Sequence, residues 1–334
     1  MTWTEPGAFP VAPGVHRIPL PLPDDGLKAV NVYTLETADG LVLVDGGWAL
    51  PAAREVLVAG LSQIGAQLGD IRRFLVTHAH RDHYTQAVTL RRETGAVVAL
   101  GAGERPTLER MQEPDRNPLD VHLDLLRRLG AGERADRMQE ALTGHPFDRD
   151  VWELPDQWLP PGEVPLPGGR VLEAVPTPGH TTGHLVFHDL AAGLLFAGDH
   201  VLPTITPSIG FEPVLSADPL GAFLRSLALV RARPDAVLLP AHGEVRDSVH
   251  ARVDELVAHH GRRLDDVHEA ATGTGEPAAA VATRLLWTRH GRSFADLDGF
   301  NAMLAIFETG AHLDLLALQG RLAREDVDGV LRYR

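Results

Sequence analysis

The sequence predicts a mixed α/β protein built from two strand-rich parts, each accompanied by helices. Three observations predict this fold class. Short apolar runs are bounded by Gly, Pro, Asn or Asp, as strands usually are. Stretches with apolar residues at helical spacing separate several of these runs. The chain has 334 residues, of which 44% are hydrophobic and 23% charged, which allows one large domain or two ordinary ones with a sizeable core.

The first strand-rich part is expected to begin with a hairpin. Residues 28–36 and 40–45 alternate in polarity around Ala38-Asp39-Gly40, which is a turn signal. The elements expected after it are a helix over 50–67, a strand at 74–76, a helix over 86–94 and a strand at 96–100.

The strand pattern returns in the second part of the chain. Short apolar runs again end beside Gly or Pro, and one stretch between them has helical spacing. The strands are expected near 170–175, 184–188, 193–198 and 236–240, with helices near 218–232 and over 246–269.

The segment 104–160 interrupts this rhythm and is predicted to be a largely helical insertion. Its leucines recur at near-helical spacing, and it ends in a Pro-rich run. Two interpretations are open: an insertion that only packs against the core, or a lid that shapes a substrate pocket. His122 and His145 lie in this segment and are expected to be core or surface histidines, not metal ligands.

The most informative motif is Thr77-His78-Ala79-His80-Arg81-Asp82-His83, directly after the apolar run 74–76. Side chains alternate at a strand end, so His78 and His80 should point to the same side. After the chain turns, Asp82 and His83 can face a second point. Imidazoles and carboxylates are the usual ligands of zinc and its neighbours. Four such residues within six positions favour a metal site over an accidentally His-rich loop.

Three later motifs supply further ligand-type side chains. Each follows a short apolar run and lies beside Gly or Pro, which indicates a loop at the end of a strand. They are His180 in Thr177-Pro178-Gly179-His180-Thr181-Thr182-Gly183-His184, Asp199 in Ala197-Gly198-Asp199-His200, and His242 in Ala241-His242-Gly243.

The ordered set HxHxDH, PGHTxGH, AGD and AHG resembles the metallo-β-lactamase superfamily in its dinuclear hydrolase form. The resemblance implies a four-layer αββα sandwich and a site for two divalent metal ions, expected to be zinc. It also implies that one ion is bound by His78, His80 and His180, that the other is bound by Asp82, His83 and His242, and that Asp199 bridges the two.

Such a pair of cations would support hydrolysis. Two ions about 3.5–4 Å apart can share a hydroxide, polarise a carbonyl or phosphoryl oxygen and steady the leaving group. We expect a hydrolase that acts on an ester, thioester or lactone through a metal-bridging hydroxide. Asp82 is the candidate catalytic residue, because it could also orient the nucleophile or accept its proton.

Other activities remain alternatives. A phosphodiesterase or ribonuclease of the same fold would need basic residues around the pocket, and a metal-dependent regulator would bind nucleic acid through the C-terminal part. An iron-dependent sulfur dioxygenase shares part of the motif, but the full second ligand set favours hydrolysis. The continuation Tyr84-Thr85-Gln86-Ala87 stands where many relatives have HxGG, which argues against a glyoxalase-II-like enzyme.

Several residues near the motifs have candidate supporting roles. The family resemblance implies that Asp45 supports the metal site from behind. The alternative is that Asp45 is only a turn residue before two glycines. Thr77, Thr181 and His184 could fix the tautomers of the ligands. Alternation predicts that His200, next to Asp199, points away from the metals.

Residues 276–334 resemble the winged-helix appendage of one branch of the superfamily. The division predicted is a domain at 1–270 and this module, which would hold helices over 278–290 and 299–319 and a hairpin around Asp328-Gly329. The second helix contains no Lys or Arg. We therefore expect the module to pack or dimerise, and not to bind DNA.

Charge and composition limit the partners, metal ligands and cellular locations that are expected for the protein. The net charge of −14 opposes nucleic-acid binding. The absence of cysteine excludes disulfides and thiolate ligands. The N-terminus lacks a secretory signal, and no run approaches the roughly 20 apolar residues of a membrane span. We expect a cytoplasmic enzyme with a small-molecule substrate and no membrane or nucleic-acid partner; a homodimer is one option for its assembly. Export is the rule for true β-lactamases, which disfavours that activity.

Overall fold

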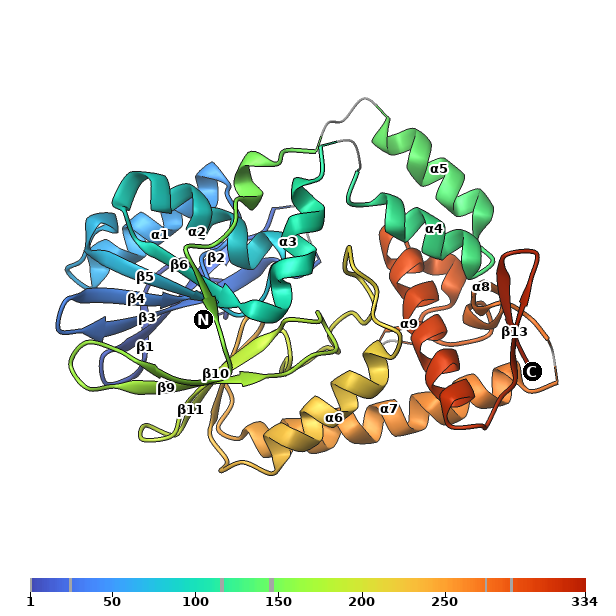
Figure 1. The fold of residues 1–334 in the computed structure, drawn as a ribbon. Helices are drawn as coiled ribbons and strands as arrows, with labels where there is room; N and C mark the ends of the chain where they lie inside the picture. Colours follow the sequence, from blue (N-terminus) through green and yellow to red (C-terminus); the bar gives the residue numbers. More distant parts are fainter. Residues whose placement is uncertain (1, 24–25, 115–116, 144–146, 274, 289–290) are drawn as a thin grey trace.

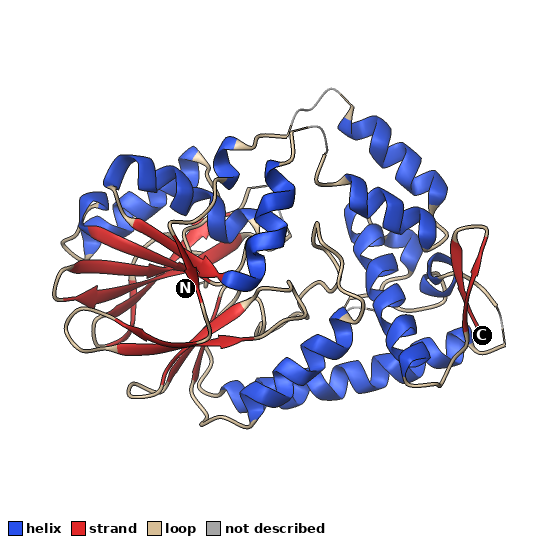
Figure 2. Ribbon diagram, viewed as in Figure 1, coloured by secondary structure: helices blue, strands red, loops and turns tan. Residues whose placement is uncertain are grey.

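The computed structural model describes residues 2–23, 26–114, 117–143, 147–273, 275–288 and 291–334. Two β-sheets face each other at one end of the molecule, and helices cover their outer faces (Figure 1). A largely helical region with a small hairpin occupies the other end (Figure 2). His145 lies outside the described residues.

The first sheet has seven strands in the order β1-β2-β3-β4-β5-β6-β7. Neighbours from β1 to β4 are antiparallel, and neighbours from β4 to β7 are parallel. The predicted hairpin is the pair β3–β4. The strands are β1 Phe9–Ala12, β2 Val15–Pro21, β3 Ala29–Thr37, β4 Gly40–Val44, β5 Ile71–Val76, β6 Val97–Gly101 and β7 Gln157–Leu159.

The second sheet has five strands in the order β12-β11-β10-β9-β8. The pair β11–β12 is parallel and the other neighbours are antiparallel. The strands are β8 Gly162–Pro165, β9 Val171–Pro176, β10 Leu185–Asp189, β11 Leu194–Gly198 and β12 Val237–Pro240.

Three buried apolar clusters define four layers. One lies between the first sheet and helices α1 (Pro51–Gln63) and α2 (Arg81–Thr94). The second lies between the two sheets, where the rings of Tyr33 and Phe196 are 5.5 Å apart. The third joins the second sheet to α6 (Pro219–Arg231) and α7 (Val249–Ala271). This αββα order confirms the predicted sandwich.

The alternation along β3 shows how the sequence produces these layers. Val30 and Val32 belong to the cluster under the helices, whereas Tyr33 and Leu35 belong to the cluster between the sheets. Successive side chains of a strand point to opposite faces, so a strand apolar at nearly every position is buried on both sides.

The middle segment is helical, as predicted, but its last residues belong to the first sheet. It contains α3 (Arg105–Gln112), α4 (Asp120–Arg128) and α5 (Gly132–Leu142). Residues 157–159 pair with β6 as strand β7, so the predicted insertion over 104–160 is too long at its C-terminal end. The backbone of β6 offers a free edge there, which a short run can complete.

The C-terminal part holds a short helix α8 (Ala278–Ala282), a long helix α9 (Gly299–Leu318) and the hairpin β13 (Arg324–Val327) with β14 (Val330–Tyr333). The predicted helix over 278–290 is shorter in the structure, because α8 ends at Ala282 and Trp287 forms a bridge with Arg292; residues 289–290 lie outside the described residues. Residues of α8 and α9 belong to the same buried cluster as α6 and α7. No helix among the described residues is long and apolar enough to cross a membrane.

Candidate metal centre

The His-rich motif joins the end of β5 to the start of α2. Strand β5 ends at Val76, and His80 immediately precedes the first turn of α2. Asp82 and His83 therefore lie in the first turn of a helix. The N-terminus of a helix carries partial positive charge, which favours a carboxylate at the position of Asp82.

The structure brings the seven predicted ligands into two adjoining groups. Within each group, one nitrogen or oxygen atom of every member lies within 4.8 Å of the others. The first group is His78, His80, His180 and Asp199, and the second is Asp82, His83 and His242. His180 follows β9, Asp199 follows β11 and His242 follows β12, so the ends of separate strands build the centre.

Hydrogen bonds to Nδ1 turn the Nε2 atoms of three imidazoles toward the centre. His83 Nδ1 donates to Asp45 Oδ2 at 2.9 Å, His242 Nδ1 to the carbonyl of Ala29 at 2.7 Å, and His180 Nδ1 to the carbonyl of Ser208 at 2.8 Å. An acceptor at Nδ1 fixes the neutral tautomer whose Nε2 lone pair is available to a cation.

His80 has the reverse orientation. Its Nε2 lies 3.3 Å from the carbonyl oxygen of Phe211, and its Nδ1 lies 3.0 Å from His180 Nε2. The two nitrogens therefore face the same point. His78 Nδ1 contacts the hydroxyl of Thr77 at 3.0 Å, so its Nε2 is the atom available to that point.

Asp199 lies between the two groups, and its two oxygens face different imidazoles. Oδ2 is 3.4 Å from His180 Nε2 in the first group. Oδ1 is 3.3 Å from His242 Nε2 and 3.6 Å from His83 Nε2 in the second group. One carboxylate thus contacts both halves of the centre.

Several of these inward-facing atoms have no other partner. Buried polar atoms are nearly always hydrogen-bonded, so a cluster of exceptions requires an explanation. In the described part of the chain, the atoms without a hydrogen bond include Nε2 of His78, His83 and His242, and Oδ1 of Asp199. A cation at each point would satisfy them.

The two groups differ in electrostatics. Burial lowers the pKa of His78 and His180, and brings that of His80 to about 3, so the imidazoles of the first group are neutral. Burial also lowers the pKa of His83, but the carboxylates of Asp45, Asp82 and Asp199 outweigh it and raise the value to about 9. A cation that binds the second group therefore displaces a proton.

The carboxylates of Asp82 and Asp199 respond in the opposite sense: their pKa values are lowered. Burial raises the pKa of Asp82 and Asp199, but the neighbouring His83 and His242 more than offset this effect. Both pKa values are held below the ordinary range. The two carboxylates are therefore charged at neutral pH and ready to bind cations.

Asp45 supports the centre from behind. Its Oδ1 accepts hydrogen bonds from the backbone N–H of Thr77 at 2.8 Å and from the Thr77 hydroxyl at 3.0 Å, while its Oδ2 holds His83. Its φ of 62° is in the left-handed region, where Asp is among the few tolerated residues. Of the two interpretations of Asp45, the geometry favours support of the site.

The other predicted neighbours have different roles. His184 receives a hydrogen bond from the backbone N–H of Asp199 at 3.2 Å, and its own Nδ1 contacts the Thr177 hydroxyl at 2.8 Å. It therefore holds the backbone of Asp199 and does not fix a ligand tautomer. His200 lies outside both groups, with its ring 5.2 Å from that of Phe223, in agreement with the alternation argument.

Two buried carboxyl groups near the centre were missed from the sequence. Glu104 accepts a hydrogen bond from the Thr181 hydroxyl, and Glu212 accepts two from Thr182 at 2.9 Å each. Burial raises the pKa of both to about 7. The only sequence signal was that Glu104 follows an apolar strand and two glycines.

These contacts anchor the loop that carries His180. A Cβ placed on Gly183 would lie 2.1 Å from the backbone nitrogen of Glu104, so the two backbones touch directly. Only glycine permits such an approach. The loop is held on its other side by Ser208 and Glu212, from the segment 201–218 between β11 and α6.

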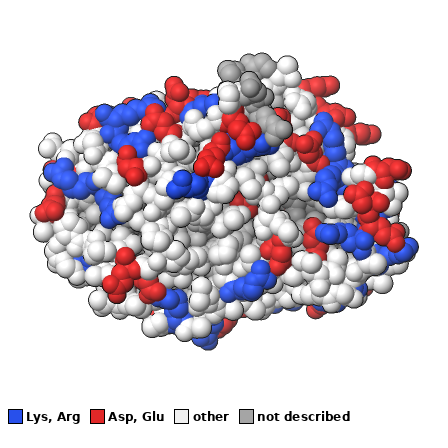
Figure 3. Space-filling view, in the orientation of Figure 1, with Lys and Arg blue, Asp and Glu red and all other residues white. Residues whose placement is uncertain are grey.

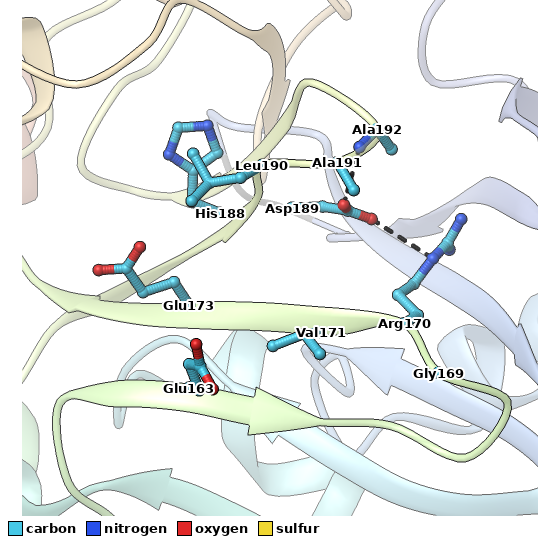
Figure 4. A pocket seen from close by; sticks show the side chains of 10 residues that line it. All are labelled: Glu163, Gly169, Arg170, Val171, Glu173, His188, Asp189, Leu190, Ala191 and Ala192. Carbon is cyan, nitrogen blue, oxygen red and sulfur yellow. Dashed lines mark hydrogen bonds and ion pairs between the residues drawn. The ribbon is translucent and has the colours of Figure 1, made fainter.

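A separate hollow of about 480 Å³ lies at the outer strands β8, β9 and β10 (Figure 4). None of the seven clustered residues lines it. Its charged groups partly neutralise one another, since Arg170 Nε is 3.3 Å from Asp189 Oδ2. It is distinct from the candidate metal centre.

Comparison with known proteins agrees with the site. Residues 25–242 match the model of the metallo-beta-lactamase superfamily. Among curated proteins, the probable metallo-hydrolase YqjP of Bacillus subtilis is 24% identical over 315 residues, covering 90% of each chain. A protein named atrochrysone carboxyl ACP thioesterase from Emericella nidulans is 23% identical over 273 residues, covering 80% of this chain and 69% of its own.

Two solved structures share nearly the whole fold. A metallo-beta-lactamase family protein from Thermus thermophilus is 29% identical with a TM-score of 0.77, covering 96% of this chain and 98% of its own. A beta-lactamase domain protein from Burkholderia ambifaria is 29% identical with a TM-score of 0.79, covering 100% of this chain and 94% of its own. The matched family, its hydrolase-named relatives and the clustered His and Asp side chains lead to one conclusion: this chain belongs to the metallo-β-lactamase superfamily and is a metal-dependent hydrolase.

Proposed function

We propose that the protein is a dinuclear hydrolase of esters, thioesters or lactones. One observation carries the proposal: the two oxygens of Asp199 face two different imidazole groups, 3.4 Å from His180 Nε2 and 3.3 Å from His242 Nε2. A carboxylate placed in this way could hold a cation in each group. The seven clustered residues are the proposed ligands, with His78, His80 and His180 at one ion, Asp82, His83 and His242 at the other, and Asp199 at both.

The donor set favours zinc. Five imidazoles and two carboxylates offer nitrogen and oxygen, and the chain contains no cysteine. Magnesium and calcium prefer sites made wholly of oxygen, whereas imidazole suits zinc, iron, copper and nickel. The Nε2 atoms of His78, His83 and His242 are buried without a hydrogen bond, and a bound ion would give each of them a partner.

When bound, the two cations would supply a water molecule of lowered pKa and an electrophilic site for a carbonyl oxygen. The residues of the chain then have separate tasks. Asp199 holds both halves of the centre together, and Asp45 keeps the His83 ring in position. Asp82, 3.4 Å from His242 Nε2, is placed to orient the attacking water and to accept its proton. Water adds to the carbonyl carbon, the acyl bond breaks, and the leaving oxygen or sulfur takes up the proton.

The surroundings favour an acyl substrate over a phosphodiester. The charges that most affect the pKa values of five residues come from the cluster itself and from Asp45, and none is an Arg or Lys; the five are His80, Asp82, His83, Asp199 and His242. Enzymes that bind phosphate generally place Arg or Lys against it. Two further observations support an acyl substrate. One relative is named a thioesterase, and the aromatic side chain of Phe211 lies beside His80.

The test combines metal analysis with a substrate panel. Protein purified without chelator should hold about two zinc ions per chain, and chelation should abolish hydrolysis that added zinc restores. The panel should include p-nitrophenyl esters, acyl thioesters, lactones and bis-p-nitrophenyl phosphate. Faster turnover of the phosphodiester than of any acyl substrate would contradict the proposal, and so would a stable content of one iron with oxygen consumption.

A further inference from the structure

A line of aromatic rings leads away from the metal centre. The ring of Phe211 lies 6.3 Å from that of His80, one of the proposed ligands. The other neighbours of Phe211 are His122 of α4, stacked at 4.6 Å, and Phe300 of α9, edge-on at 5.7 Å and 88°. Segments far apart in the sequence therefore meet beside the centre.

Phe211 is firmly held in this position. Its carbonyl oxygen contacts His80 Nε2 at 3.3 Å, and the next residue, Glu212, is bonded to Thr182. On its far side, His122 is 2% exposed, and burial lowers the pKa of its imidazole to about 4, so this ring is neutral at physiological pH. The buried, uncharged ring of His122 thus packs behind the half-buried ring of Phe211 and holds it in place.

Phe300 lies in the first turn of α9, where Gly299 and Asn301 are exposed as well. Twelve residues of α9 are buried, whereas Phe300 in the first turn is 52% exposed. An exposed aromatic ring that packs on Phe211, the neighbour of His80, is a candidate contact for an apolar ligand.

We propose that Phe211 and Phe300 bind the acyl part of the substrate, and that this part is apolar or aromatic. The inference rests on the proposed acyl hydrolysis and adds a substrate class to it. The order of the rings gives the orientation: the scissile carbonyl lies at the metal centre, and the acyl group extends past Phe211 toward Phe300. Helix α9 therefore contributes to the substrate site, although it lies outside the segment that carries the ligands.

The test compares two substrates that differ only in the acyl group. For p-nitrophenyl acetate and p-nitrophenyl 4-phenylbutanoate, the ratio of kcat/KM measures the contribution of the acyl group. Phe300→Ala should lower the ratio of kcat/KM for the phenylbutanoate to kcat/KM for the acetate by about tenfold. Binding of an apolar group in a pocket changes kcat/KM by about this factor. Phe211→Leu, which keeps the volume but not the ring, should lower it in the same direction.

The matched control is Leu318→Ala. Leu318 lies at the other end of α9 and is 62% exposed, so its substitution removes a comparable exposed side chain. The ratio should remain that of the unchanged protein. Calorimetric titration with 4-phenylbutyrate gives a readout independent of turnover: binding should weaken about tenfold in Phe300→Ala and remain unaltered in Leu318→Ala.

The outcomes separate the two proposals. If the unchanged protein hydrolyses both esters and Phe300→Ala leaves the ratio and the 4-phenylbutyrate affinity unaltered, the acyl-binding inference is wrong and the hydrolase proposal stands. If Phe300→Ala alters only the oligomeric state, Phe300 is a subunit contact and the inference is again wrong. If no acyl substrate is hydrolysed by the zinc-loaded protein, the proposed function fails, and the inference fails with it.

Discussion

Asp45 and His83 are joined by a buried hydrogen bond of 2.9 Å between Asp45 Oδ2 and His83 Nδ1. The bond connects the residue after β4 to the first turn of α2. It leaves His83 Nε2 facing Asp82 and Asp199, at 3.8 Å and 3.6 Å. The second half of the metal centre therefore depends on a residue that is not one of its proposed ligands.

Asp45→Asn should weaken metal binding by the second group about 10-fold to 100-fold, the usual effect of losing an outer carboxylate partner. The amide cannot accept from both Thr77 and His83 as the carboxylate does. Asn tolerates the left-handed backbone at φ 62°, so the fold is preserved. Competition with a zinc chelator measures the affinity.

The control for this substitution is Asp328→Asn. Asp328 has φ 52° in the turn between β13 and β14, so the backbone requirement is the same. Zinc affinity should not change. Equal weakening in both variants would show that the effect of Asp45→Asn is general destabilisation.

Asp199→Ala should remove one of the two metal ions and lower kcat by about 100-fold or more, because it removes the carboxylate whose two oxygens face both groups. His200→Leu should keep both ions. His200 is fully buried against Phe223, and Leu approximates its volume without leaving a cavity. Elemental analysis of the two variants measures their metal content. Loss of metal from His200→Leu would show that the roles of Asp199 and His200 are misassigned.

Acid should destabilise the contact between α7 and α9. His260 Nδ1 lies 3.3 Å from His312 Nε2, and His312 Nδ1 donates to the carbonyl of Glu308. Burial lowers the pKa of His312 to about 3 and of His260 to about 2. The pKa of histidine in an unfolded chain is about 6.5. As the pH falls, the unfolded chain therefore binds protons before the folded protein does. The free energy of unfolding should therefore decrease below about pH 6.5, by about 2 kcal/mol per histidine at pH 5.

The double variant His260→Leu, His312→Leu tests the assignment. Other groups face the pair, namely Arg263 and His259, and they remain in the variant. Thermal unfolding between pH 7.5 and 5 should show a shallower loss of stability than in the unchanged protein. An identical pH dependence would mean that other groups, such as the metal-binding histidines, account for the acid sensitivity.

Deleting residues from 276 onward should give aggregated or unstable protein. Met303, Ile306 and Phe307 of α9 pack in the same buried cluster as α6 and α7. Their removal exposes the apolar faces of both helices to water. Size-exclusion chromatography and circular dichroism would detect the loss, and a monodisperse, active truncated enzyme would refute the expectation.

The intact protein should not bind duplex DNA tightly. Helix α9 has no Lys or Arg, and most of its residues are buried, so it offers no basic face to a row of phosphates. On the face of the molecule shown in Figure 3, Lys and Arg side chains are interspersed with those of Asp and Glu. Fluorescence anisotropy at low and high salt is the measurement. Tight binding that weakens steeply with salt would favour the alternative of a regulator that binds nucleic acid through residues 276–334.

Local patterns were enough to predict most strands and helices and all seven clustered residues. The alternation around Ala38-Asp39-Gly40 gave the β3–β4 hairpin, and the Asp328-Gly329 signal gave β13–β14. Errors occurred where tertiary contacts decide an element's limits. Residues 157–159 became a strand because β6 offered them an edge, and α8 ended at Ala282.

By itself, the sequence determined which residues form the cluster of candidate metal ligands, because strand ends and glycine-flanked turns place His and Asp in a recognisable order. Only the tertiary structure decided how these side chains are held. Asp45, Ala29 and Ser208 fix three imidazoles through contacts that span many residues of chain. Only the fold, likewise, could bring Phe211 and Phe300 together beside His80. Periodicity reports on near neighbours in the chain, whereas such contacts depend on how the layers pack.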